Sequence, residues 1–109
     1  MAGIDPSVIK KAEAALEVLS RITKVDSAYV FGSQVEGRAD EWSDVDLAVF
    51  IEGLDSWSLR DRVGAAVEVQ KTVGDDVEVH FFPSLAARVP AQASFADWIL
   101  AHGVELSMV

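Results

Sequence analysis

Residues 31–49 read FGSQVEGRADEWSDVDLAV, and this stretch decides how the rest of the chain is interpreted. Gly32 and Ser33 follow a short apolar run, while Asp44 and Asp46 flank a valine where a longer one begins. Side chains two residues apart on an extended chain point the same way, so these carboxylates would lie side by side. Glycine lets the backbone approach a ligand closely, and the following N–H groups with the Ser33 hydroxyl can cradle a phosphate. The segment predicts a site for a divalent metal and a nucleoside triphosphate.

Each part of this segment also has an ordinary structural interpretation. Gly-Ser alone is typical of a strand-to-helix turn in which Ser33 is the N-cap. Ser43 and Asp44 alone fit a turn or a cap. Asp46 is different because it enters an apolar strand, where aspartate is disfavoured, and a buried carboxylate needs a partner. A metal is one such partner, since Mg²⁺ is held by one or two carboxylates together with substrate phosphates.

A third acidic residue is expected on a later strand. Residues 76–82 alternate, and their polar face carries Asp76, Glu78, His80 and also Phe82. Glu78 would meet the two aspartates if this strand pairs beside residues 45–51, whereas the alternative is a solvent-facing glutamate. Asp76, nearer the turn, is the competing candidate. His80 is expected to be an ordinary strand residue, although an imidazole can bind a metal or a base.

Three tryptophans are candidates for stacking on a nucleotide base. Trp98 fits the apolar stripe of the last helix and is expected in the core. Trp42 lies beside the aspartates and is the best stacking candidate; Trp57 is the third.

The pattern of the whole chain predicts the order α-β-β-α-β-α. Asp5 and Pro6 fit an N-cap and first helical position, and apolar spacing then predicts a helix of roughly 17 residues. Strands are expected at residues 28–31, 45–51 and 76–82, the second covered on both faces. A second helix is expected over residues 56–72, with an apolar stripe formed by Leu59, Val63, Ala66, Val67 and Gln70.

The last part of the chain contributes smaller elements. Residues 84–90 are expected to be irregular or a short helical turn. A final helix begins at Ser94 or Ala96 and ends at Gly103, and residues 104–108 fit a short edge strand. The expected fold is an α/β or α+β domain over residues 1–109, with a small mixed sheet and helices packed against it in two or three layers.

Composition narrows the function. The 109 residues carry 18 acidic against 9 basic side chains, a net charge of −9, which argues against a broad nucleic-acid surface. A small nucleotide remains compatible because a bound metal inverts the local charge, and a basic protein partner is compatible too. The chain has no cysteine, no long uncharged apolar run and no signal-peptide pattern, which fits a cytoplasmic protein without a membrane span.

The motif as a whole resembles that of the minimal nucleotidyltransferases of the DNA polymerase β superfamily. It is carried by Gly32-Ser33, Gly37 and Ser43-Asp44-Val45-Asp46-Leu47. The resemblance implies a polymerase-β-like fold with helices on one side of the sheet. It also implies that Asp44, Asp46 and a third acid, Glu78, hold two Mg²⁺ ions, and that Gly32, Ser33, Arg38 and Ser43 bind the nucleotide.

The reaction implied by the resemblance is transfer of a nucleoside monophosphate, AMP from ATP, to an acceptor hydroxyl with release of pyrophosphate. Small relatives stand beside an all-helical partner in toxin–antitoxin pairs, so the acceptor could be such a partner protein; a homodimer is also compatible. The sequence departs from the family where arginines are common, with Gln34, Val35 and Glu36 there, and Arg38 as the replacement charge. Glu78 replaces the usual aspartate.

These departures favour the alternative function, a catalytically weak or inactive antitoxin-type binding module that inhibits a helical partner protein. A calcium loop is excluded because the aspartates lack its alternating ligands and its glycine.

Overall fold

A four-stranded mixed sheet forms the centre of the molecule. The computed structural model describes residues 5–32, 44–89 and 92–106. Within them the strand order is β3-β2-β1-β4, from β1 Val25–Phe31, β2 Val45–Ile51, β3 Val77–Pro83 and β4 Val104–Glu105. β1 runs antiparallel to both of its neighbours, while β2 and β3 are parallel. The first strand is longer than predicted, and the predicted edge strand has two residues.

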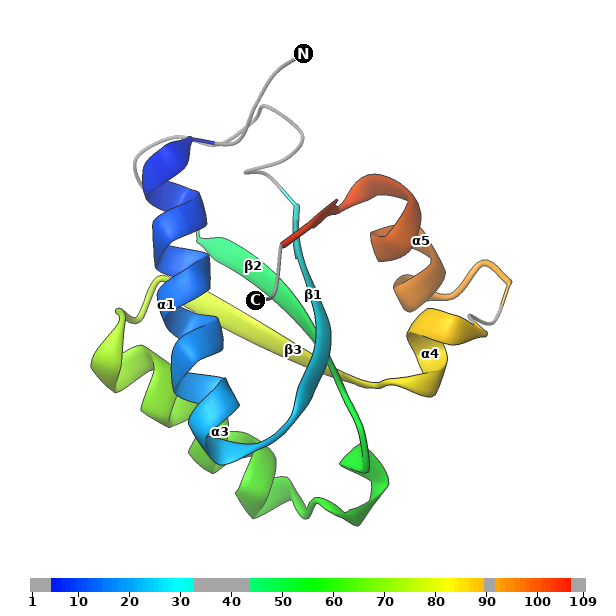
Figure 1. Cartoon of the computed structure of the whole chain (residues 1–109), viewed down its shortest axis with the longest axis horizontal. Coiled ribbons are helices and arrows are strands. Elements are labelled where there is room, and N and C mark those ends of the chain that lie inside the picture. The colour runs from blue at the N-terminus through cyan, green and yellow to red at the C-terminus, as the bar shows by residue number, and fades with distance from the viewer. Residues whose placement is uncertain (1–4, 33–43, 90–91, 107–109) are drawn as a thin grey trace.

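Helices cover both faces of the sheet (Figure 1). The bounds are α1 Pro6–Ile22, α3 Leu59–Thr72, α4 Leu85–Arg88 and α5 Phe95–His102, with a single 3-10 turn, η1, at Leu54–Ser56. α1 and α3 pack on one face, and the short α4 and α5 pack on the other. The fold is therefore α+β with a small mixed sheet, as predicted, but the expectation of helices on one side only is wrong.

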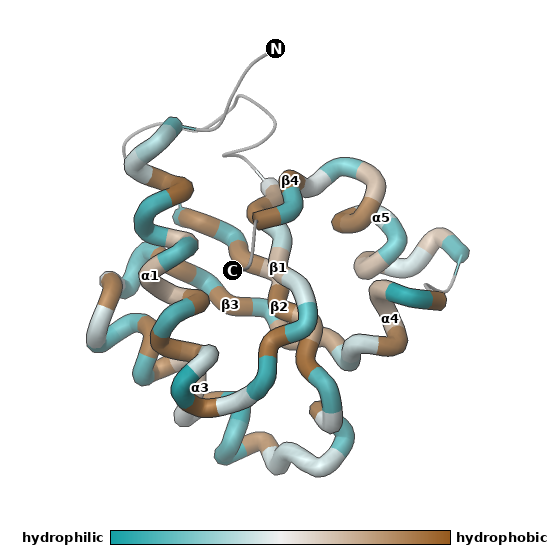
Figure 2. The backbone as a smooth tube through the Cα atoms, in the orientation of Figure 1, coloured by the Kyte–Doolittle hydropathy of each residue, from teal (hydrophilic) through white to brown (hydrophobic). Residues whose placement is uncertain are grey.

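β2 is buried on both faces, as its continuous apolar run predicts. Its residues from Leu47 to Ile51 have no exposed area. Leu47, Val49 and Ile51 belong to the larger core under α1 and α3, whereas Ala48 and Phe50 belong to a smaller core under α5. Figure 2 shows hydrophobic residues (brown) in the central strands and also at intervals along the helices. β2 thus contributes side chains to both cores, and its burial on both faces holds the residues at its ends in place.

α1 forms where the sequence predicts it. Asp5 is the N-cap, and its Oδ1 accepts a hydrogen bond from the Ser7 N–H at 2.9 Å, with Pro6 at the first helical position. Its buried face is small and apolar: Ala12, Ala15, Leu16, Val18 and Leu19. Small alanines let the helix approach the sheet closely.

α3 differs from the predicted helix in its first residue and in the face that it buries. It begins at Leu59 because Ser58 forms a capping box, in which Ser58 Oγ accepts from the Asp61 N–H and Asp61 accepts from the Ser58 N–H.

The buried residues of α3 are Ala65 and Val69. The predicted stripe is largely on the outside: Leu59, Val63 and Val67 are exposed. Apolar residues lie around most of this helix, so packing against α1 and β3, rather than the pattern, selects the inner face.

The observed inner face of α3 predicts that two valines of this helix, Val69 and Val67, contribute differently to the free energy of unfolding. Val69→Ala removes a fully buried side chain and should lower the free energy of unfolding by about 2 kcal/mol. Val67→Ala is the matched control, with the same gain in helix propensity, and should change it by less than about 0.5 kcal/mol. Urea denaturation of both variants measures the difference. Equal losses would show that the two positions are equally packed.

α5 begins at Phe95, after Ser94, whose Oγ accepts a hydrogen bond from the Asp97 N–H at 3.1 Å. Trp98 was expected in the core, but it is 36% exposed and stacks on Phe95 and His102. The buried residues of this helix are Ala96 and Ile99, so the tryptophan covers the rim of the smaller core.

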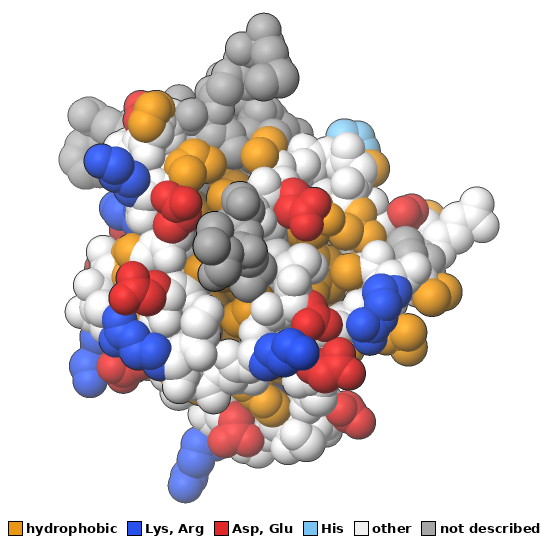
Figure 3. All heavy atoms as spheres, viewed as in Figure 1, with side chains coloured by type: hydrophobic (Ala, Val, Ile, Leu, Met, Phe, Trp, Pro, Cys, Tyr) orange, Lys and Arg blue, Asp and Glu red, His pale blue; other side chains and the backbone are white. Residues whose placement is uncertain are grey.

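The surface carries no single area of one charge on the face seen in Figure 3, where acidic and basic side chains are interspersed. Along residues 5–32, 44–89 and 92–106, no helix combines the length and the apolar character that crossing a membrane requires.

Candidate functional site

The register of two parallel strands brings the acidic residues together. β2 and β3 pair from Val45 opposite Val77, so Asp46 lies opposite Glu78. The Val45 N–H donates to the Asp76 carbonyl oxygen at 2.7 Å, which holds the start of this register. Paired residues project their side chains to the same face, here the face that carries α5. Asp46 and Glu78 therefore lie side by side at the amino ends of their strands.

His80 completes a cluster with these two carboxylates. Its Nε2 lies 3.6 Å from Asp46 Oδ1 and 3.7 Å from Glu78 Oε1. One potential ligand atom from each of the three residues lies within 4.8 Å of the others. The side chains of Asp46 and His80 are 25% and 29% exposed, and that of Glu78 is 59% exposed. The cluster thus has a partly buried base and an open side from which an ion and its ligands can enter.

Aromatic side chains hold the imidazole in place. The His80 ring makes edge-on contacts with Phe31 on β1 and Phe95 on α5, at centroid distances of 5.1 and 6.1 Å. His80 Nε2 is shielded from solvent, and among the described residues it has no hydrogen-bond partner. From the sequence alone, His80 is expected to be an ordinary strand residue. Its position two residues after Glu78, on the same face, was the available signal for its place in the cluster.

Gly32 lies against Asp46 and has a structural role there. Its φ is +83°, and a Cβ at this position would lie 2.5 Å from Asp46 Oδ2. The contact arises because Phe31, the preceding residue, pairs with Asp46 across β1 and β2. Only glycine combines this backbone conformation with room for the carboxylate. Gly32 is therefore needed to leave space for the Asp46 carboxylate, independently of any contact with a phosphate.

Asp46 is held in an environment that disfavours its charge. Burial raises the pKa of Asp46; the charges of Glu78 and Asp44 raise it further, while His80 acts in the opposite direction. A carboxylate with such a balance gains most from a bound cation, because the cation offsets both the lost hydration and the repulsion from its neighbours. The electrostatics of the cluster are thus those of a cation site.

The two other aspartates are placed differently. Asp44 is exposed and immediately precedes β2, outside the three-residue cluster, although its charge acts on Asp46. Asp76 pairs with Lys11 of α1, with Nζ 2.6 Å from Oδ2. The structure thus brings Glu78, rather than Asp76, beside Asp46.

Several predicted site residues lie outside the described part of the chain. Ser33, Arg38, Trp42 and Ser43, together with the departures at residues 34–36, fall in the range 33–43. Trp57 lies far from the cluster in the fold, since it packs on Phe81 in the core under α1 and α3.

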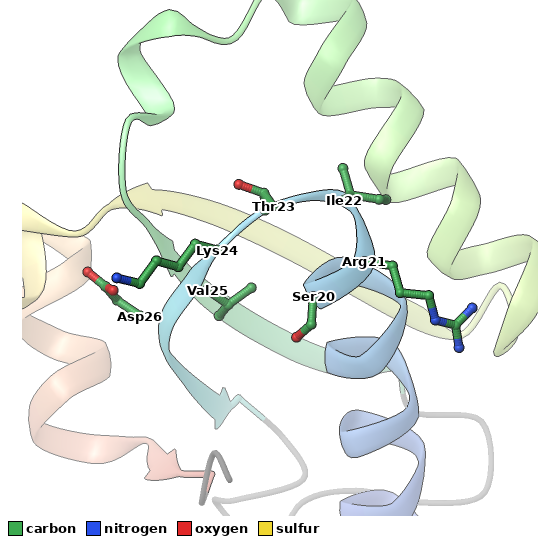
Figure 4. Close-up of a pocket in the computed structure, with 7 residues that line it drawn as sticks. All are labelled: Ser20, Arg21, Ile22, Thr23, Lys24, Val25 and Asp26. Atoms are coloured by element: carbon green, nitrogen blue, oxygen red, sulfur yellow. The ribbon is translucent and has the colours of Figure 1, made fainter.

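A hollow at the opposite end of β1 is unrelated to this cluster. It lies at the turn from α1 into β1, where Arg21, Lys24 and Asp26 are among its lining residues (Figure 4). The cluster instead lies beyond the carboxyl end of β1, next to Gly32.

The family of the chain follows from comparison with known proteins. The polymerase beta nucleotidyltransferase family matches residues 13–105, which is most of the chain. The protein belongs to this family and is a nucleotidyltransferase of the polymerase β superfamily. No curated protein matches the chain.

Two solved structures share the fold. A toxin–antitoxin crystal structure with AMP-PNP is 22% identical, with a TM-score of 0.64 over 90% of this chain and 73% of that chain. A protein from Sulfolobus solfataricus, provisionally described as a nucleotidyltransferase, is 21% identical, with a TM-score of 0.54 over 81% of this chain and 84% of the other.

Proposed function

We propose that this protein transfers a nucleoside monophosphate, AMP from ATP, to an acceptor hydroxyl in a reaction that depends on a divalent metal. In this proposal residues 1–109 act as one nucleotidyltransferase domain. The observation that carries it is the convergence of Asp46, Glu78 and His80 on one open face in a chain of this family. The shielded His80 Nε2, which has no hydrogen-bond partner among the described residues, and the disfavoured charge of Asp46 fit a bound cation.

In this proposal different residues bind the metal and the triphosphate. Asp44, Asp46 and Glu78 would hold Mg²⁺, two ions when nucleotide is bound. Bound metal lowers the pKa of an acceptor hydroxyl and stabilises the leaving pyrophosphate. Gly32, Ser33, Arg38 and Ser43 are proposed to hold the triphosphate, and Gly32 also keeps the space that Asp46 needs. Most of the rate enhancement would come from positioning and from charge stabilisation, as in other phosphoryl and nucleotidyl transfers.

We place the acceptor hydroxyl on a partner protein. The similar structure of a toxin–antitoxin crystallised with AMP-PNP supports both a nucleotide and a protein partner, of which an all-helical toxin is the expected kind. The acceptor protein is best sought in the neighbouring reading frame.

The second candidate is a binding module that inhibits the partner without catalysis. Glu36 favours it, because a carboxylate close to the triphosphate would repel it. The double variant Asp44→Asn/Asp46→Asn separates the two functions. Unchanged inhibition of the partner by this variant would support the binding module, and lost inhibition together with lost AMP transfer would support the enzyme.

The third acid gives a prediction with an internal control. Glu78→Gln should lower kcat for AMP transfer at least about 100-fold, because it removes a negatively charged ligand worth several kcal/mol in the transition state. Asp76→Asn breaks only the ion pair with Lys11, whose partners are 35% and 40% exposed, and should leave kcat within about threefold. Transfer of radiolabelled AMP from ATP to the partner protein measures both. The reverse order of effects would assign the third acid to Asp76.

A further inference from the structure

We propose that His80 is itself a metal ligand, so that the site prefers Mn²⁺ over Mg²⁺. The Nε2 nitrogen of His80 would be a donor in addition to the carboxylates of the proposed site, of which Asp46 and Glu78 belong to the same three-residue cluster. This inference rests on the proposed function, since it names the metal of the same site, but its test needs no catalysis.

The geometry around His80 Nε2 is that of a ligand rather than of a hydrogen-bonded side chain. Its distances to Asp46 Oδ1 and Glu78 Oε1 are 3.6 and 3.7 Å, too long for hydrogen bonds. Atoms that share one ion at about 2.1 Å lie roughly 3 to 3.5 Å apart. Glu78 is the exposed member of the set, so a small rotation of its side chain closes the group.

Among the described residues, this nitrogen lies near the two carboxylate oxygens of Asp46 and Glu78. Nε2 is shielded from solvent and has no hydrogen-bond partner there, a situation that is unfavourable for a buried polar atom. The imidazole is oriented by the edge-on contacts of Phe31 and Phe95, and those rings offer no polar atom of their own. Packing therefore directs a nitrogen that has no hydrogen bond within the described part of the chain toward two carboxylates that a shared cation would bridge.

The identity of the third donor determines the metal preference. Mg²⁺ is a hard ion that takes oxygen ligands and keeps several waters. An imidazole nitrogen favours first-row transition ions, whose affinity for mixed nitrogen and oxygen sites rises from Mn²⁺ along the series. A site with carboxylate donors alone would hold Mg²⁺ and Mn²⁺ more equally than one that also has an imidazole nitrogen, so His80 is the residue that shifts this chain toward Mn²⁺.

Metal binding by the full chain without nucleotide tests the inference. Free Mn²⁺ is followed by its EPR signal, and Mg²⁺ is added as a competitor. His80→Gln should weaken Mn²⁺ binding about tenfold or more and Mg²⁺ binding by less than about threefold. The chain has two histidines, so His102→Gln is the matched control. His102 is exposed, stacks on Trp98, and should change neither affinity when replaced.

A spectroscopic signature provides the second readout. Pulsed EPR of the Mn²⁺-loaded protein should show coupling to a directly bound ¹⁴N nucleus in the wild type and in His102→Gln, and none in His80→Gln. Equal losses of Mn²⁺ and Mg²⁺ affinity in His80→Gln, or no nitrogen coupling in the wild type, would overturn the assignment. Nitrogen coupling in a protein that transfers no AMP would uphold the ligand and refute the proposed function instead.

Discussion

Asp46→Asn is expected to abolish AMP transfer while raising the thermal stability of the metal-free protein. The loss of transfer follows from the position of Asp46, which lies at the partly buried base of the cluster with Glu78 and His80. The amide keeps the size of the side chain but removes its charge, and a neutral ligand neither holds a divalent ion as well nor offsets its charge. We expect kcat to fall at least about 1000-fold, the effect of several kcal/mol.

The gain in stability follows from the unfavourable environment of the carboxylate. Burial raises the pKa of Asp46, and the charges of Glu78 and Asp44 add to that effect. A carboxyl group with a raised pKa in the folded state favours folding when protonated, and this contribution is lost as the pH rises through that folded-state pKa. At pH 7 the ionised Asp46 therefore destabilises the metal-free fold. The advantage of the asparagine should be present at pH 7 and be smaller at an experimental pH of about 4, because the wild-type carboxyl takes up a proton as the pH falls through its raised folded-state pKa.

Thermal denaturation with a chelator present measures this difference at both pH values. Asp75→Asn is the control, because Asp75 is exposed in the turn before β3 and its replacement should change neither stability nor transfer. If Asp46→Asn transfers AMP as fast as the wild type, Asp46 is not a ligand of the catalytic metal and the proposed site is wrong. A lower melting temperature at pH 7 would show that Asp46 stabilises the empty fold, against the electrostatic account.

Gly32→Ala is expected to damage both the fold and the site. The left-handed conformation at φ +83° disfavours any side chain, by roughly 1–2 kcal/mol. In addition, the new Cβ would lie 2.5 Å from Asp46 Oδ2, so the carboxylate or the end of β1 must move. Because metal ligands need accurate placement, we expect metal affinity and AMP transfer to fall at least about 100-fold.

Gly53→Ala separates these two effects. Gly53 has nearly the same backbone conformation, with φ +75°, but nothing lies within 4 Å of its Cβ position. It should show the conformational loss in stability and leave metal binding intact. A double-mutant cycle completes the test: once Asp46→Ala has removed the carboxylate, Gly32→Ala should cost no more stability than Gly53→Ala. Equal effects of the two glycine variants on metal binding would refute the contact with Asp46.

Local patterns predicted most of the fold because they report on neighbours along the chain. The N-cap at Asp5, the continuous apolar run of β2 and the alternation of β3 each belong to one segment. Each formed as predicted, except that β3 begins and ends one residue later than expected. The alternation of β3 also placed Glu78 and His80 on one face. The same local reasoning did not find the start of α3 at Leu59, since it overlooked the capping box of Ser58 and Asp61.

Tertiary structure decided what depends on residues far apart in the chain. The inner face of α3 is set by α1 and β3, and an apolar pattern that covers most of the helix cannot show it. The positions of the two candidate acids also depend on the tertiary structure: the register of β2 with β3 puts Glu78 beside Asp46, and Asp76 pairs with Lys11 instead. In the same way, the sequence identified Gly32, Asp46 and Glu78 as candidates, because strand position and residue type are local. The contact of Gly32 with Asp46, and the place of His80 between two carboxylates, required the sheet, because only strand pairing and packing by α5 bring those atoms together.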